Sequence, residues 1–205
     1  MSILPYPDRL TAFARRIGRT LLPGSCLLCG TDSPDDLLCL DCRADLPSLP
    51  SARCPLCTDQ TTHGERCGAC LKDPPHFDRT IAAFTYDFPL DRIVHALKYG
   101  HQLAVANWCA QQLAPRVDSA ALDCIIPLPL HPERLRQRGF NQSGEIAKRL
   151  ARASGLPIAH NSLLRMRATT AQADLPHKER RNNVRGAFEC RTDFSGKRLL
   201  LIDEI

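Results

Sequence analysis

The sequence predicts an α/β protein, in which a domain built on a parallel β-sheet follows a small double zinc ribbon. Four C-x-x-C pairs between residues 26 and 70 have the ligand spacing of zinc ribbons. Further along the chain, short apolar runs typical of buried strands alternate with amphipathic helical patterns. We expect an N-terminal amphipathic helix over residues 1–24, the zinc ribbons over 25–74 and the α/β domain over 75–205.

The N-terminal segment does not read as a secretory signal. Arg15, Arg16 and Arg19 interrupt the stretch where such a signal needs an apolar core. The apolar spacing there fits a short helix instead. No apolar run in the sequence reaches the ~20 residues of a membrane span. We therefore expect a cytoplasmic protein that does not insert into a membrane.

The eight clustered cysteines are the expected zinc ligands. Each half of the module has the spacing C-x2-C-x9-C-x2-C, and two C-x-x-C pairs complete one tetrahedral site, so two zinc ions are expected. Pairing of neighbouring C-x-x-C motifs is the simplest arrangement, and a crossed arrangement stays open. The predicted ligands are Cys26, Cys29, Cys39, Cys42, Cys54, Cys57, Cys67 and Cys70. The three isolated cysteines, Cys109, Cys124 and Cys190, are expected to be small core residues.

Charge divides the chain into two parts of opposite sign. Residues 26–90 hold ten Asp/Glu against five Lys/Arg, whereas residues 134–191 hold thirteen Lys/Arg against four Asp/Glu. A polyanion should therefore bind the second part. An acidic zinc module is a poor main surface for DNA, because phosphate contacts dominate DNA affinity. For this module we expect a folding or protein-docking role.

The α/β part alternates strand-like and helix-like patterns. The expected strands are Thr80–Phe88, Asp123–Leu130 and Lys197–Ile202. The expected helices are two within Leu90–Leu113, broken at Tyr99-Gly100, and one over Asn141–Ala153 that stops at Gly155. Asp203 and Glu204 then follow the last strand, where ligands bind in open α/β sheets.

Four strings carry a resemblance to a known family: LLPGSCLLCG, IIPLPLHPERLRQRGFNQ, TTAQADLPHKERRNNVRGAF and KRLLLIDEI. In this order they resemble the ComF family of competence-associated proteins, over nearly the whole chain. The double zinc ribbon and the run R-x-R-x-R-G-F-N-Q are its specific parts. The resemblance implies a type I phosphoribosyltransferase fold behind the zinc ribbons.

The resemblance also implies a binding site for phosphoribosyl pyrophosphate (PRPP). The turn after IIPLPL would be the pyrophosphate loop, where Arg134, Arg136 and Arg138 contact phosphate oxygens. Asp203 and Glu204 would hold the ribose hydroxyls of Mg-PRPP. The stretch Arg165–Arg185 resembles a mobile flap. A solvated basic face is the alternative for these arginines, as it is for Lys178, Arg180 and Arg181.

The sequence departs from the family pattern at its end. In phosphoribosyltransferases a Thr/Gly-rich loop that binds the 5′-phosphate follows the acidic pair, but this sequence stops at Ile205. We therefore expect the domain to be incomplete at its C-terminus, and this 205-residue chain to lack phosphoribosyltransferase activity. Mg-PRPP would be a ligand only of a full-length form.

Three functions compete. In the first, the protein handles incoming single-stranded DNA during natural transformation, alongside a competence helicase or another DNA-uptake protein. The expected DNA contacts are Arg134, Arg136, Arg138, Lys178, Arg180 and Arg181, and scarce aromatics favour contact with the DNA backbone over stacking. The second is a phosphoribosyltransferase that uses Mg-PRPP on an unknown acceptor. The third is a zinc-ribbon adaptor for protein partners. We favour the first.

Overall fold

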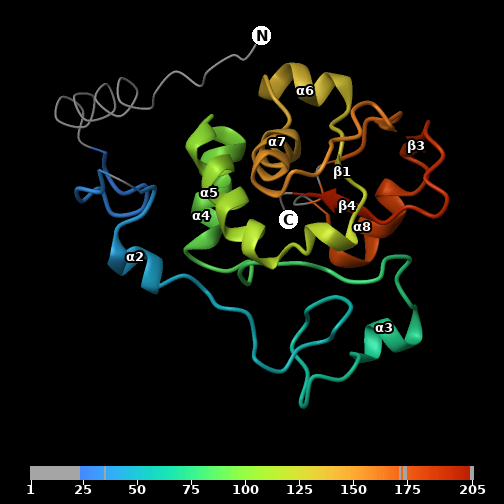
Figure 1. Ribbon diagram of the computed structural model, residues 1–205, viewed down its shortest axis with the longest axis horizontal. Helices are drawn as coiled ribbons and strands as arrows, with labels where there is room; N and C mark the ends of the chain where they lie inside the picture. Colours follow the sequence, from blue (N-terminus) through green and yellow to red (C-terminus); the bar gives the residue numbers. More distant parts are fainter. Residues whose placement is uncertain (1–23, 35, 171, 173–174, 204–205) are drawn as a thin grey trace, which may run out of the picture. The chain divides into compact units, whose positions relative to one another are not determined.

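The computed structural model describes residues 24–34, 36–170, 172 and 175–203 (Figure 1). The predicted N-terminal helix over residues 1–24 lies almost wholly outside them, and Glu204 lies outside them too. The described elements are α2 (Leu40–Ala44), α3 (Gly68–Lys72), α4 (Leu90–Tyr99), α5 (Leu103–Leu113), η1 (Ala114–Arg116), η2 (Ser119–Ala121), β1 (Cys124–Pro127), α6 (Pro132–Arg138), α7 (Gln142–Ser154), β2 (Leu163–Arg165), α8 (His177–Val184), β3 (Phe188–Cys190) and β4 (Leu199–Ile202).

The chain divides into two compact units between Leu46 and Pro47. This division falls between the two halves of the cysteine-rich region, so each half belongs to a different unit. The boundaries expected at residues 24/25 and 74/75 stay predictions.

The two halves of the cysteine-rich region repeat one local structure at an offset of 28 residues, from Cys26 to Cys54. An antiparallel bridge brackets the first C-x-x-C pair of each half, Ser25 to Asp32 in one and Arg53 to Gln60 in the other. A five-residue helix, α2 or α3, begins directly after the third cysteine of each half. Equal cysteine spacing therefore gives equal folding, as expected for two ribbons.

The parallel sheet of the second unit joins segments far apart in the sequence. Strand β1 pairs in parallel with β4, from Cys124 opposite Leu199 to Pro127 opposite Ile202. A parallel bridge from Ile125 to Ile158 continues the sheet on the other side of β1. The predicted strands after residues 122 and 196 and their parallel arrangement are thus confirmed. Strands β2 and β3 form a separate antiparallel pair.

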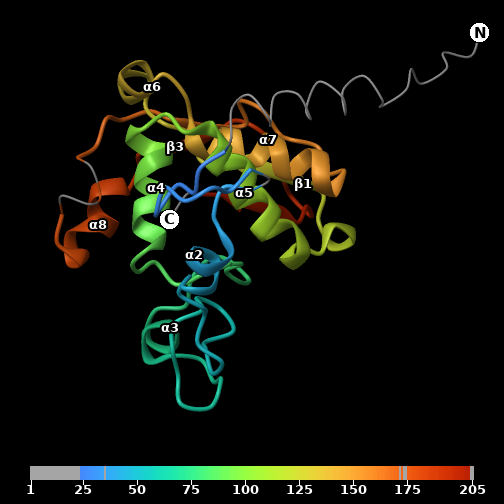
Figure 2. The ribbon, with the colours of Figure 1, turned by 90° about the vertical axis from the view of Figure 1, so that its left-hand side faces the viewer.

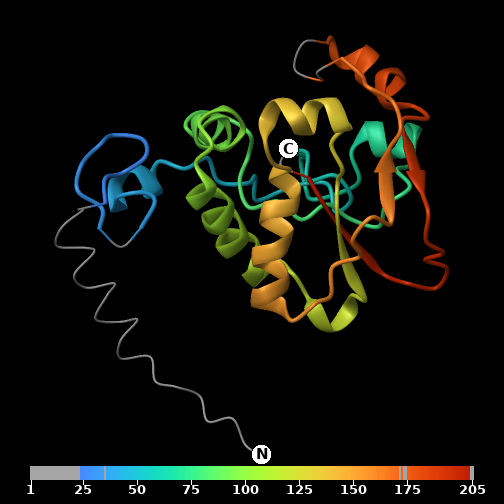
Figure 3. The same ribbon diagram turned by 90° about the horizontal axis from the view of Figure 1, so that it is seen from above.

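Helices pack on this sheet through the apolar stripes that the sequence shows. Helix α7 packs against β1 and β4, and α5 packs against α7 (Figure 3). Ile125, Ile146 and Leu150 are fully or almost fully buried in this layer. The ring of Trp108 on α5 stacks on that of Phe84, with 5.6 Å between their centroids.

The predicted helix boundaries agree with the structure. Helices α4 and α5 are separated at Gly100, whose N–H bonds the carbonyl of Ala96. Helix α7 ends at Gly155, which takes the left-handed conformation (φ 75°) that closes a helix.

The predicted strand Thr80–Phe88 is wrong, because this segment holds no strand. The backbone N–H groups of this segment instead donate hydrogen bonds to carbonyls between residues 47 and 56, in the second compact unit. The N–H of Thr80 donates to Leu56 O (2.7 Å), and that of Thr85 donates to Pro47 O (3.0 Å). Since those partners are isolated loop carbonyls, no ladder forms despite the β-rich composition.

Candidate functional site

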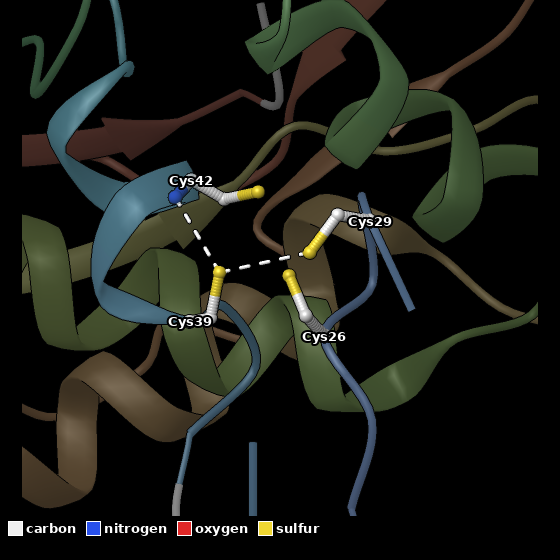
Figure 4. A group of neighbouring side chains, drawn as sticks. All are labelled: Cys26, Cys29, Cys39 and Cys42. Carbon is white, nitrogen blue, oxygen red and sulfur yellow. Dashed lines mark hydrogen bonds between the residues drawn. The ribbon is translucent and has the colours of Figure 1, made fainter. Parts of the chain in front are cut away.

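The eight clustered cysteines form two groups of four, and neighbouring motifs pair. Within each group the sulfur atoms lie within 4.8 Å of one another. One group is Cys26, Cys29, Cys39 and Cys42 (Figure 4); the other is Cys54, Cys57, Cys67 and Cys70. The pairing that the sequence left open is therefore sequential.

The sulfur spacing fits a zinc ion at the centre of each group. Cys29 Sγ lies 3.6 Å from Cys39 Sγ, and Cys57 Sγ lies 3.5 Å from Cys67 Sγ. Zn–S bonds of ~2.3 Å in a tetrahedron place neighbouring sulfurs about 3.8 Å apart. Figure 4 shows the four sulfurs of the first group directed toward one another, from a loop and from α2. Two four-cysteine groups fit two zinc ions.

The electrostatics of the groups also favour a cation. Burial alone would raise the pKa of Cys26, but hydrogen bonds from the backbone N–H groups of Cys29, Cys39 and Leu28 lower it to about 6. Backbone N–H groups likewise lower the pKa of Cys54 to about 6. These N–H groups stabilise a thiolate, which is the form that binds zinc.

Once one cysteine of a group is ionised, its negative charge disfavours ionisation of the other three. Interaction with Cys29 raises the pKa of Cys42 above its usual range, while burial, with added interactions from the neighbouring thiols, raises the pKa of Cys70 to about 12. A divalent cation removes this repulsion, since its charge offsets that of the thiolates. A metal ion therefore favours the ionised form of all four thiols in each group.

The isolated cysteines differ from one another. Cys109 and Cys124 are half-buried, but Cys190 is exposed on β3, where its thiol donates to Thr192 O (3.3 Å). The expectation of a core position is wrong for Cys190, because β3 pairs with β2 in a two-stranded sheet that leaves Cys190 exposed.

The three arginines of the R-x-R-x-R run lie on a helix, not in the expected turn. Helix α6 begins at Pro132, which needs no N–H partner at a first helical position, and His131 Nδ1 accepts the N–H of Glu133 (3.4 Å). It ends at Gly139, in the left-handed conformation (φ 75°). Positions 134 and 138 share one face of α6, whereas Arg136 is exposed.

Arg134 and Arg138 contact different neighbours. Arg134 lines a cavity of about 140 Å³ together with Arg165 and Thr169. The Arg138 guanidinium lies over the Tyr99 ring, and its Nη1 donates to Gln142 Oε1 (3.3 Å). Both arginines are half-buried, and these contacts fix the Arg138 guanidinium between Tyr99 and Gln142.

The carboxyl edge of the parallel sheet brings Asp203 beside the segment that leads into α6. Leu128, directly after β1, donates its N–H to Ile202 O (2.9 Å), and Asp203 follows Ile202. Asn141 at the start of α7 donates to Leu128 O (3.0 Å). Asp203, the β1–α6 segment and the N-terminus of α7 therefore share one edge.

Sequence reasoning did not assign Asn141 and Gln142 to the site. Among the described residues, Asn141 Oδ1 and Gln142 Nε2 are buried without a hydrogen-bond partner. The sequence did contain a signal for these two residues: the dipeptide N-Q ends the run R-x-R-x-R-G-F-N-Q and stands at the start of a helix. Buried amide groups with spare hydrogen-bonding capacity at this edge are suited to a polar ligand.

The other predicted DNA contacts lie on a different helix. Lys178, Arg180 and Arg181 are on α8, which Figures 1 and 3 show apart from α6. Arg181 forms an ion pair with Asp73, and Arg180 Nε donates to Leu175 O (3.1 Å). The six predicted contacts are thus distributed over two helices. None of the described helices is long and apolar enough to cross a membrane.

Comparison with known proteins gives one domain family and several relatives. The double zinc ribbon domain matches residues 17–71. Competence protein F of Haemophilus influenzae is 29% identical over 179 residues, 82% of this chain and 77% of that protein. DNA utilization protein YhgH of Salmonella typhimurium is 30% identical over 196 residues, which cover 90% of this chain and 85% of that protein. Competence protein ComFC of Bacillus subtilis is 24% identical over 187 residues, 84% of this chain and 73% of that protein. No solved structure matches the chain significantly.

Proposed function

The chain belongs to the family of Competence protein F and DNA utilization protein YhgH, and we propose that it handles incoming single-stranded DNA during natural transformation. The observation that carries the proposal is the position of α6. This helix presents three arginines next to the carboxyl edge of a parallel sheet, where α/β proteins bind their ligands. We place the role in the cytoplasm, because a reducing compartment keeps zinc-binding thiolates from forming disulfides.

Electrostatics support a DNA backbone as the ligand of α6. Against Arg134, Arg136 and Arg138 this helix has a single acid, Glu133. Arginine presents a planar set of donors that matches phosphate oxygens. Contact with phosphates releases counterions from DNA, which gives affinity without sequence preference. Both properties suit a protein that handles DNA of any sequence.

A protein partner is the expected role of the zinc ribbons. The partner we propose is a competence helicase or another DNA-uptake protein. Residues 26–90 carry twice as many acids as bases, so this part should repel DNA and remain available to a protein. The short helices α2 and α3 have exposed leucines, Leu40 and Leu71, that are 82% and 65% exposed.

PRPP binding is the second candidate function, on a scaffold of the phosphoribosyltransferase type. The position of Asp203 favours it, since a carboxylate at the end of β4 lies at the same edge as Asn141 and the α6 segment. Mg-PRPP would supply the phosphoribosyl group to an acceptor. Titration calorimetry with Mg-PRPP tests this candidate. If Asp203→Asn releases as much binding heat as the wild type, the candidate is contradicted.

The DNA proposal is tested with fluorescently labelled single-stranded oligonucleotides. We expect anisotropy to report binding that weakens steeply as salt rises. Arg136→Ala should weaken binding to all sequences and reduce the slope of log K against log[salt] by about 0.7. The matched control is Arg152→Ala, an exposed arginine in the last turn of α7. A chain that binds no single strand, or binds it independently of salt, would contradict the proposal.

A further inference from the structure

Figure 2 shows the C-terminal end of α4 close to α6. Five side chains with a flat π face lie at these two helix ends, in two contacting sets. They are His95 and Tyr99 from α4, His101 directly after it, and Arg138 and Phe140 on either side of Gly139. We propose that this group, the stacking surface, binds the bases of single-stranded nucleic acid. The inference rests on the proposed function and adds a second mode of contact to it.

The rings and the guanidinium of the stacking surface contact one another, and both ring pairs are tilted rather than parallel. The His95 and Tyr99 rings lie 4.6 Å apart and are tilted by 40°. On Tyr99 the Arg138 guanidinium carbon lies 5.4 Å from the ring centroid. The rings of His101 and Phe140 are 5.7 Å apart and are tilted by 57°. Single-stranded bases stack on aromatic rings and on guanidinium planes, the two kinds of group that this surface offers.

Exposure distinguishes this group from ordinary core packing. Tyr99 is 58% exposed although two neighbours contact its ring, and His95 and His101 are exposed as well. Aromatic rings that serve only to fill a core lose their contact with water. Here the described neighbours leave ring surface in water, where a further flat apolar partner gains by covering it.

The surrounding charges favour a polyanion as the occupant. Arg92 and Lys98 lie on α4, and Lys98 is next to Tyr99 in its last turn. The α6 arginines continue this positive charge beyond Arg138. The acids of the two helices, Asp91 and Glu133, are both in first turns, the ends of these helices away from Tyr99 and Arg138. A strand whose bases stack on Tyr99 would therefore find cations close by for its phosphates.

Few aromatic residues are needed for this mode. The whole sequence has only three Tyr, seven Phe and one Trp, which argues against an extended stacking platform. The fold compensates by bringing residues from positions 95–101 and 138–140 together. Stacking on one or two bases is compatible with binding that tolerates any sequence, since every base has a π face.

The test compares two oligonucleotides of equal length and charge, one of deoxythymidines and one of abasic spacers. The wild-type chain should bind the thymidine strand more tightly, because only that strand can stack. Tyr99→Leu keeps an apolar side chain but removes the ring. We expect it to weaken thymidine binding roughly 5- to 100-fold, with little effect on the abasic strand and no change in the salt slope. The control is Phe77→Leu, another half-exposed aromatic, at a position outside the stacking surface.

A second readout does not depend on affinity. Strands with 5-iodouracil should form photo-crosslinks to peptides that contain Tyr99 or Phe140, since such crosslinks form with stacked aromatic rings. If the wild type binds single strands but Tyr99→Leu retains full preference for bases over abasic sites, the inference is overturned while the proposed function stands, and the surface is left to a protein partner. If the wild type binds neither strand, both are overturned.

Discussion

The carboxylate of Asp123 holds the backbone of Arg198, 75 residues further along the chain. Asp123 Oδ2 accepts the N–H of Arg198 (2.8 Å), and Oδ1 accepts a hydrogen bond from Lys197 Nζ (3.2 Å). The N–H of Asp123 also donates to Arg198 O (2.8 Å). Because these residues precede β1 and β4, this contact fixes the register of the parallel pair and so the place of Asp203 at its other end.

Asp123→Asn should destabilise the fold at neutral pH. The hydrogen bond from the Arg198 N–H, with that from Lys197, lowers the pKa of Asp123 below its ordinary value. A carboxylate with a lowered pKa stabilises the folded state above its unfolded pKa, about 3.9, and loses this effect as pH falls through the folded value. Thermal unfolding should show a lower Tm for the variant at pH 7 and converging Tm values below about pH 4.

The control for this variant is Asp193→Asn, whose carboxylate accepts hydrogen bonds from Ser195 within its own turn. We expect a smaller effect there, because a local turn does not join two strands. Equal Tm values of Asp123→Asn and wild type at pH 7 would contradict the prediction.

Two glycine substitutions should change stability in opposite directions. Gly139 has φ 75°, and a Cβ added there would meet no atom within 4 Å, so Gly139→Ala adds no clash but costs about 1 kcal/mol of backbone energy. Gly144 lies inside α7, where a Cβ would make ordinary contact with Asn141. Gly144→Ala should therefore stabilise by about 0.5–1 kcal/mol. Urea unfolding followed by the fluorescence of Trp108, the single tryptophan, measures both.

The two zinc sites should be lost one at a time. Wild-type protein should contain two zinc ions per chain by elemental analysis, and Cys26→Ser or Cys54→Ser should each leave about one. The sites lie in different compact units, so loss of one should spare the other. Cys190→Ser, outside both groups, should retain two. Loss of both ions from either ligand variant would instead indicate a shared site.

Thiol labelling should separate the isolated cysteines. Burial raises the pKa of Cys109 to about 12, so at pH 8 only about one molecule in 10,000 carries the reactive thiolate. Cys190 is exposed. In zinc-loaded protein an alkylating reagent should modify Cys190 first and Cys109 far more slowly, as peptide mapping by mass spectrometry would show. Fast modification of Cys109 would mean that its helix opens readily.

Local patterns account for much of this structure. The C-x-x-C spacing predicted two four-cysteine groups, because ligands close in sequence need only a local turn to face one ion. The apolar runs before Asp203 and around Ile125 predicted the parallel strands, and Gly100 and Gly155 marked helix ends. Each cysteine motif, each single strand and each helix end depends on residues within a few positions of one another, so the sequence alone determined where they lie.

Other features depend on partners that are distant in the sequence. Thr80–Phe88 has strand-like composition, but its hydrogen-bond partners are Leu56 and Pro47, and a pattern of side chains does not reveal them. The pairing of the four C-x-x-C motifs was likewise open until the backbone placed them.

The stacking surface illustrates most clearly the difference between features set by local sequence and features set by distant contacts. The sequence contains Tyr99 and Arg138 at unrelated positions, and its scarcity of aromatics argued against stacking. The tertiary structure decided that α4 and α6 end side by side, which places the guanidinium on the ring. The sequence by itself determined the zinc ligands, the main helices and the positions of β1 and β4, since these follow from local spacing. Only tertiary packing decided which distant side chains meet, because such contacts arise from the burial of whole helices and strands.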